Sequence, residues 1–157
     1  MIIYQYKKCV FSFMEVLKEF SSFYTNLASM KIDELSSIYS DDVLFIDPIA
    51  QHTGLPAIEK YFTKLLQNAK YCQFVIHNQQ ADDNGQQAVN CIVNWTMEYK
   101  TAKMKHGKPI RVDGITMLTV RNNKITFHRD YYDLGQMVYE NIPLLGSIIK
   151  RIRRSMA

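Results

Sequence analysis

Apolar residues recur at every second position through much of the second half of the chain. The longest such run is Val89, Cys91, Val93, Trp95, Met97 and Tyr99, and shorter runs occupy 72–76, 110–120 and 125–133. A period of two is typical of strands that bury one face. The turn sequences "DDNG" and "RNNK" separate these runs, so the pattern predicts a meander of four long antiparallel strands.

The first part of the chain follows helical spacing instead. Apolar residues at steps of three and four predict a first helix from about Phe11 to Ala28. Asp33 is expected to cap a short second helix, "VLFI" at 43–46 to form a short strand, and Pro56 to open a third helix. With a further amphipathic helix after Leu134, this order predicts an α+β fold with its helices segregated to one face of a curved sheet.

Length and charge limit the class of protein. The 157 residues suit a single domain, 1–157, of which 134–157 form a C-terminal helical extension. The net charge of +4 is concentrated in "KRIRR" at 150–154, so the body is close to neutral. A neutral body argues against a nucleic-acid-binding domain. No secretory signal is convincing, and no segment approaches the roughly 20 apolar residues of a membrane span.

The cysteines do not indicate a metal site. Cys9, Cys72 and Cys91 are odd in number, lack metal-type spacing and sit among apolar neighbours, which favours buried thiols in a reducing cytoplasm. The sequence also lacks a glycine-rich phosphate loop and a nucleophile elbow. We therefore expect neither a metal nor an organic cofactor. The segment before Met14 is poorly patterned, so Met1 and Met14 both stay open as the biological start.

Two segments carry a resemblance to a known family. "YSDDVLFIDP" early in the chain and "KITFHRDYYDLG" late in it, in this order of elements, resemble the SnoaL-like branch of the nuclear transport factor 2 (NTF2) fold over roughly Phe11 to Tyr139. The resemblance implies a cone: a strongly bent, mainly antiparallel sheet with N-terminal helices on its concave face, a C-terminal helix and a mostly apolar pocket. Members include ketosteroid isomerase, scytalone dehydratase, polyketide cyclases and many non-catalytic binding modules, so the fold implies a pocket rather than one reaction.

The last strand, "KITFHRDYYDL", looks like that of limonene epoxide hydrolase, another member. The Asp in that enzyme's "RDY" acts in acid catalysis, and Asp130 matches it here. The enzyme also needs an Arg and a second Asp, two apart, on an earlier strand. This chain has "VNWTMEY" there, with Trp95 and Met97 expected to face inward and Glu98 outward. The missing pair argues against epoxide hydrolysis by that mechanism.

Asp130 and His128 form the sharpest candidate pair. If Asp130 points into the cone, alternation also turns Thr126, His128 and Tyr132 inward. A carboxylate beside an imidazole in an apolar interior is suited to general acid–base catalysis near neutral pH. The alternative is a buried Asp that backbone donors or a Tyr hydroxyl hold in place without chemistry. Both interpretations stay open for ligand contact, and the structural one is favoured over turnover.

Asp47 and several apolar residues complete the candidate site. Asp47 ends the first strand in "FIDP", either as a base beside a substrate carbonyl or, as we favour, as the cap of the following turn. His128, Tyr132 and Asp47 are expected to orient the ligand. The remaining ligand-binding wall is expected from Phe45, Trp95, Met97, Val112 and Gly114, although a plain core would place the apolar residues similarly. His52, His77 and His106 are expected to be solvated.

The sequence therefore predicts a cytoplasmic protein that binds a small hydrophobic molecule. Whether it is an enzyme stays open. As an enzyme it would be a cofactor-independent lyase, isomerase, cyclase, dehydratase or hydrolase with Asp130 as acid or base. The alternative is a non-catalytic ligand-binding or dimeric interaction module. The identity of the ligand cannot be told from the sequence.

Two surfaces are expected to make further contacts. Phe127, Arg129 and Tyr131 should face outward and are too apolar and aromatic for a free surface, which predicts a homodimer. Arg111 and Asp113 should share that outward face. The C-terminal segment "PLLGSIIKRIRRSMA" has one apolar stripe and four basic residues. We expect it to dock as a helix over the mouth of the cone, and transient contact with anionic lipid or an acidic partner is the weaker alternative.

Overall fold

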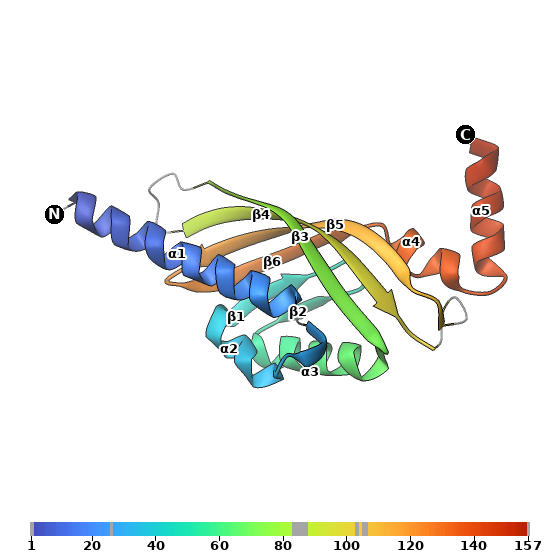
Figure 1. Ribbon diagram of the computed structural model, residues 1–157, viewed down its shortest axis with the longest axis horizontal. Helices are drawn as coiled ribbons and strands as arrows, with labels where there is room; N and C mark the ends of the chain where they lie inside the picture. The colour runs from blue at the N-terminus through green and yellow to red at the C-terminus, as the bar shows by residue number, and fades with distance from the viewer. Residues whose placement is uncertain (1, 26, 83–87, 103, 105–106, 157) are drawn as a thin grey trace.

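The computed structural model describes residues 2–25, 27–82, 88–102, 104 and 107–156. Six strands form one curved, unclosed sheet, and α1, α2 and α3 lie on one face of it (Figure 1). The α+β cone expected from the sequence is thereby confirmed. Within the described ranges, no helix combines the length and apolarity needed to cross a membrane.

The elements follow the expected order. The helices are α1 (Ile2–Thr25), α2 (Leu35–Ile38), α3 (Leu55–Asn68), α4 (Leu134–Met137) and α5 (Leu145–Met156). The strands are β1 (Tyr39–Ile46), β2 (Gln51–Thr53), β3 (Tyr71–Asp82), β4 (Ala88–Lys100), β5 (Ile110–Arg121) and β6 (Lys124–Tyr132). Short 3₁₀ turns at Leu27–Ser29 (η1), Ile32–Glu34 (η2) and Tyr139–Asn141 (η4) join them.

The strand order is β2-β1-β6-β5-β4-β3. The last four strands in sequence form the predicted antiparallel meander, and "RNNK" makes its tight turn through Asn122 and Asn123, both at positive φ. β1 runs parallel to β6, with Phe45 opposite His128. This pairing brings the early "FIDP" segment beside the late "FHRDYY" segment, as the site requires.

One hydrophobic core fills the space between the concave face of the sheet and α1–α3. Phe20 from α1, Ile58 from α3 and Val93 from β4 are almost completely buried in it. Cys72 and Cys91 are buried there as well, and burial raises the pKa of the Cys72 thiol to about 12 and of the Cys91 thiol to about 11. These two are therefore inert thiols, as expected; the side chain of Cys9 lies outside the described residues.

The boundaries of the early elements differ from the expectation in several places. α1 begins at Ile2 rather than near Phe11. Asp33 does not cap α2, because it lies inside the 3₁₀ turn that runs into this single-turn helix. β1 starts at Tyr39, four residues before "VLFI". The three-residue strand β2 was not expected at all, and it is too short for a period of two to show. The "DDNG" turn lies mostly outside the described residues.

The expectation that the C-terminal helix docks over the cone is wrong. α5 stands away from the sheet, and its main packing is against η4 (Figure 1). Its apolar residues Ile148 and Ile152 are 58% and 53% exposed. The short α4 is the part of this region that joins the core, through the buried Met137.

Candidate functional site

The inward face of β6 carries the candidate pair. His128 is completely buried, the Asp130 side chain is 13% exposed, and Tyr132 is half-buried. Phe20, Tyr24, Tyr39 and Phe45 surround the His128 ring, and the Phe45 ring lies nearest, with 4.4 Å between ring centroids. Thr126 does not share this inward face, because the register between β5 and β6 shifts at this residue and leaves Ile125 buried instead.

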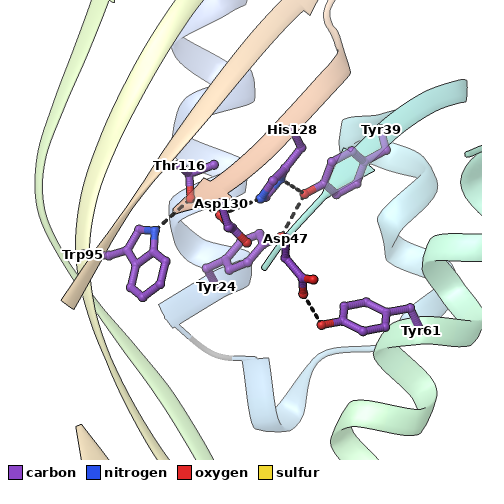
Figure 2. Close-up of polar contacts among 8 residues, drawn as sticks. All are labelled: Tyr24, Tyr39, Asp47, Tyr61, Trp95, Thr116, His128 and Asp130. Atoms are coloured by element: carbon purple, nitrogen blue, oxygen red, sulfur yellow. Dashed lines mark hydrogen bonds and ion pairs between the residues drawn. The ribbon is translucent and has the colours of Figure 1, made fainter. Parts of the chain in front are cut away.

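A chain of hydrogen bonds runs through this pair from one side of the cone to the other (Figure 2). On one side, His128 Nδ1 lies 2.7 Å from the Tyr39 hydroxyl, which lies 2.9 Å from the Tyr24 hydroxyl. His128 Nε2 lies 2.9 Å from Asp130 Oδ1. On the other side, the Thr116 hydroxyl donates to the same Oδ1 at 2.5 Å. Trp95 Nε1 donates to the Thr116 oxygen at 2.8 Å.

Strand pairing explains why these groups meet. Thr116 lies directly opposite Asp130 in the β5–β6 ladder, where side chains on one face are close neighbours. Trp95 lies opposite Gly114, and its indole packs directly over that residue. A Cβ at this position would overlap the ring, so only glycine permits this packing. The missing side chain lets the indole N–H reach Thr116, two residues further along β5. Gly114 therefore shapes the site by having no Cβ.

An ionised Asp130 together with a neutral His128 ring fixes the direction of every hydrogen bond in this network. A carboxylate only accepts, so Thr116 donates its hydroxyl proton and His128 donates from Nε2. His128 Nδ1 then accepts from Tyr39, and the Tyr39 oxygen accepts from Tyr24. Burial raises the pKa of both phenols well above the ordinary tyrosine value, so both keep their protons at neutral pH. Every buried polar group in the chain then has a partner with the imidazole neutral.

One carboxylate oxygen and one hydroxyl on this face have no hydrogen-bond partner among the described residues. Both hydrogen bonds of Asp130 go to Oδ1, and the described part of the chain offers none to Oδ2. The same is true of the Tyr132 hydroxyl, two residues along the same face and so about 6.6 Å further along the strand. Burial and the charges of Asp47 and Asp130 raise the pKa of Tyr132, which therefore stays protonated as a donor.

Asp47 is held more firmly than Asp130. Its Oδ1 accepts from the backbone N–H groups of Ile49 and Ala50 at 2.8 and 2.7 Å, and its Oδ2 accepts from the Tyr61 hydroxyl on α3. Figure 2 shows the phenol of Tyr61 pointing at this carboxylate. Burial and the neighbouring Asp47 charge raise the pKa of Tyr61, so it stays a donor. This geometry is the turn cap that the sequence favoured, with a phenol added.

The other expected wall residues all lie on the inward side. Phe45, Trp95, Met97 and Val112 are buried, and Arg111, Glu98 and Asp113 are exposed on the convex face, as expected. The concave side of β4 therefore presents Trp95 and Met97 where the epoxide hydrolase mechanism needs an Arg and an Asp. No group of three His, Cys, Asp or Glu among the described side chains is arranged to hold a metal ion.

A cavity of about 570 Å³ opens beside Tyr61. Its walls come from the β1–β2 turn, α3 and the end of β4, and are lined by Ile49, Ala50, His52, Ala57, Lys60, Tyr61, Lys64, Leu65 and Tyr99. The expectation that His52 is solvated is wrong. Its ring lies against that of Tyr61, with 4.4 Å between ring centroids. Its Nε2 is buried without a hydrogen-bond partner among the described residues. His77, exposed, bonds to Thr96 on the convex face, and His106 lies outside the described residues.

The sequence analysis assigned no site role to four residues of the hydrogen-bonded site: Tyr24, Tyr39, Tyr61 and Thr116. Thr116 shares the parity of Val112 and Gly114 on β5, and that parity was the signal for its inward position. Tyr39 opens the "YSDDVLFIDP" segment, but the strand expected there covered only 43–46 and left Tyr39 out. Tyr24 and Tyr61 read as ordinary apolar positions on their helices.

The comparisons with known proteins agree with this geometry. Residues 20–128 match the family described as SnoaL-like domain, which is more than half of the chain. The chain belongs to the SnoaL-like domain family. The matched region ends at His128, so Asp130 and Tyr132 lie just beyond it. No curated protein matches this sequence.

Three solved structures illustrate the likeness in fold. One has a ketosteroid isomerase-like fold and comes from Catenulispora acidiphila DSM 44928, in complex with trimethylamine (20% identity, TM-score 0.65, 82% of this chain and 94% of that chain). Another is an LEH-like epoxide hydrolase of M. tuberculosis (16%, 0.62, 80% and 86%). A third is TerC co-crystallised with polyporic acid (18%, 0.63, 80% and 95%). At these identities the likeness shows the shared cone alone.

The first prediction concerns the link between Trp95 and Asp130. Thr116→Val keeps the shape of the side chain but removes the hydroxyl, which leaves the buried indole N–H without an acceptor. We expect the free energy of unfolding in urea to fall by about 1–3 kcal/mol. The fluorescence of Trp95, the only tryptophan in the chain, should also change.

Thr119→Val is the matched control on the same strand. The Thr119 hydroxyl bonds to Asn90 at an exposed position, so its loss should cost little. Equal stability losses and an unchanged emission spectrum in both variants would contradict the described hydrogen-bond chain.

Proposed function

We propose that this SnoaL-like protein binds a small, largely apolar molecule on the concave face of its sheet and catalyses proton transfer on it with Asp130. The observation that carries the proposal is the free Asp130 Oδ2. Its partner oxygen accepts from Thr116 and His128, which orients the carboxylate, while Oδ2 keeps its capacity to accept a proton. Such a group is suited to act as a general base and then as a general acid.

Tyr132 supplies the second half of the chemistry in this proposal. Its protonated hydroxyl lies one side-chain step from Asp130 on the same face of β6. When Asp130 removes a proton beside a carbonyl group, negative charge develops on the carbonyl oxygen, and a nearby O–H donor stabilises it. Asp130 then returns the proton at another atom. These two proton transfers are the reaction of an isomerase, or the proton-transfer steps of a cyclase or dehydratase, and they require no cofactor.

His128 and Asp47 act as positioning residues in this proposal. His128 holds Asp130 through Nε2 and has no exposed surface with which to touch a ligand. Both oxygens of Asp47 are engaged, so its role is to hold Tyr61. Trp95, Met97, Val112 and Phe45 supply the apolar wall, and Gly114 leaves room for the indole.

The cavity beside Tyr61 supports the expected ligand class. Its volume of about 570 Å³ lies within the range of small-molecule sites. Apolar residues form most of its wall, and Lys60 and Lys64 on α3 favour a ligand with a carboxylate or acidic hydroxyl. The acid in TerC points the same way. Neither Asp130 nor Tyr132 lines this cavity. Tyr61 lines it and contacts Asp47, so the proposal requires the ligand to displace this phenol or neighbouring core side chains before it reaches Asp130.

Catalysis is testable as hydrogen–deuterium exchange beside a carbonyl. We expect the protein in D₂O to accelerate deuterium uptake by members of a panel of aromatic ketones and β-dicarbonyl acids, followed by NMR. Asp130→Asn keeps the shape but cannot take the proton, so the rate should fall by about 10²–10⁴-fold. Ligand-induced thermal stabilisation should change little.

Asp113→Asn is the matched control, because Asp113 lies on the convex face and cannot reach the ligand. It should exchange at the wild-type rate. Thermal stabilisation by a ligand without exchange in the wild type would establish the alternative, a non-catalytic binding module. Equal exchange by wild type and Asp130→Asn would overturn the role of Asp130.

The convex face favours an assembly, and we propose a homodimer through it. Ile92, Met117 and Arg129 are neighbours across three strands, and Ile115 and Tyr131 form the next rung. The four apolar or aromatic side chains among them are each about 39–42% exposed, and Arg129 stacks on Tyr131 at 4.8 Å. Contiguous exposed apolar residues mark interfaces.

We also propose the cytoplasm as the location of the protein, since Cys72 and Cys91 stay thiols in a reducing compartment.

The dimer prediction is checked by analytical ultracentrifugation at micromolar concentration. The wild type should sediment as a dimer, and Met117→Glu should sediment as a monomer, because it places a charge at the centre of the patch. Met14→Glu is the control, since Met14 is exposed on α1, on the other side of the sheet. A monomeric wild type would contradict the proposed interface.

A further inference from the structure

α5 is sharply divided into an apolar and a basic face. With 3.6 residues per turn, its five apolar side chains fall within an arc of about 100°; they are Leu145, Ile148, Ile149, Ile152 and Met156. The remaining circumference carries four basic residues: Lys150, Arg151, Arg153 and Arg154. The helix contains no acidic residue. The apolar arc is therefore bordered by positive charge on both sides.

The protein leaves most of the apolar arc uncovered, although Ile149 is partly buried and Leu145 is less exposed than Ile148. Ile148, Ile152 and Met156 are 58%, 53% and 82% exposed, and the main packing of α5 is against η4 (Figure 1). Among the described residues, Arg153 alone of the four basic residues has an acidic partner, Glu140 on η4. Three cations and the apolar arc therefore face solvent together.

The junction with the body holds α5 in this position. Gly146 packs against the backbone of Glu140 so closely that a Cβ would overlap its carbonyl oxygen. The ion pair between Arg153 and Glu140 ties the helix to η4 two turns further on. Leu144, just before the helix, has a positive φ of 67° and turns the chain away from the body. These contacts with η4 and the turn at Leu144 hold α5 in the orientation that leaves its apolar arc exposed.

We propose that α5 binds the surface of an anionic lipid bilayer. A helix with a narrow apolar arc and a strongly basic face lies in the membrane interface, with its apolar side chains below the headgroups and its cations beside the lipid phosphates and carboxylates. Each basic side chain near an anionic surface adds to the attraction. A second copy of α5 is a poorer occupant, because pairing two such helices brings like charges together with no acid to offset them.

The test is flotation of the full chain with vesicles of phosphatidylcholine alone or mixed with phosphatidylserine. We expect the wild type to float with the mixed vesicles at low salt, to be released at high salt and to ignore pure phosphatidylcholine. Ile148→Ser with Ile152→Ser should weaken binding by roughly tenfold or more, since both side chains leave the interface. Lys150→Glu with Arg154→Glu should weaken it to a similar extent, by roughly tenfold.

Matched controls separate α5 from the rest of the surface. Met14→Ser removes an apolar side chain that is 58% exposed, as Ile148 is, but lies on α1. Lys31→Glu reverses an exposed charge before η2. Both should bind like the wild type.

Three outcomes would overturn the proposal. The first is a wild type that binds neither kind of vesicle. The second is binding that the α5 variants leave unchanged. The third is a change in sedimentation of the protein alone in Ile148→Ser with Ile152→Ser, without vesicle binding, which would identify a second copy as the occupant of the arc.

Discussion

The site depends on the complete burial of one imidazole. His128 has no exposed surface and lies among four aromatic rings, so neither ring nitrogen can bond to bulk water. A buried polar group without a partner costs about 1–3 kcal/mol. The fold meets this demand by placing Tyr39 on one side of the ring and Asp130 on the other. The parallel pairing of β1 with β6 is what puts Tyr39 there.

The same demand separates the two carboxylates of the site. Asp47 uses both oxygens to hold a turn and Tyr61, so it stabilises the rim of the cone. Asp130 accepts hydrogen bonds from His128 and Thr116 with Oδ1, and its Oδ2 accepts none from the described residues. One carboxylate therefore has both oxygens engaged, and the other keeps one oxygen without a partner among the described residues, which is the basis of the proposed ligand contact. The proposed membrane contact through α5 is separate from this chemistry, because the helix stands away from the sheet and its main packing is against η4.

Sequence analysis predicted the elements that have a repeating apolar pattern and missed the contacts between residues far apart in the sequence. Period-two alternation located β3–β6, and it placed Trp95, Met97, Val112 and His128 inward correctly. It failed at Thr126, where one extra residue in the strand shifts the register without any sign in the pattern.

The partners of His128 were beyond local reasoning for a related reason. Tyr39 lies 89 residues away in sequence, and only the pairing of β1 with β6 reveals the contact. The misplaced α5 has another cause: an amphipathic stripe predicts that a helix needs a partner, but it does not say whether the partner is its own core.

The protonation pattern of His128 tests the account most directly. Nitrogen-15 NMR of labelled protein at neutral pH, with the His128 signals assigned by their absence in His128→Gln, reports which ring nitrogen carries the proton. The account predicts a neutral ring with the proton on Nε2, facing Asp130, and an unprotonated Nδ1 that accepts from Tyr39. A proton on Nδ1, or signals averaged by exchange with water, would contradict the directed hydrogen-bond chain and with it the pairing of a neutral His128 with an ionised Asp130.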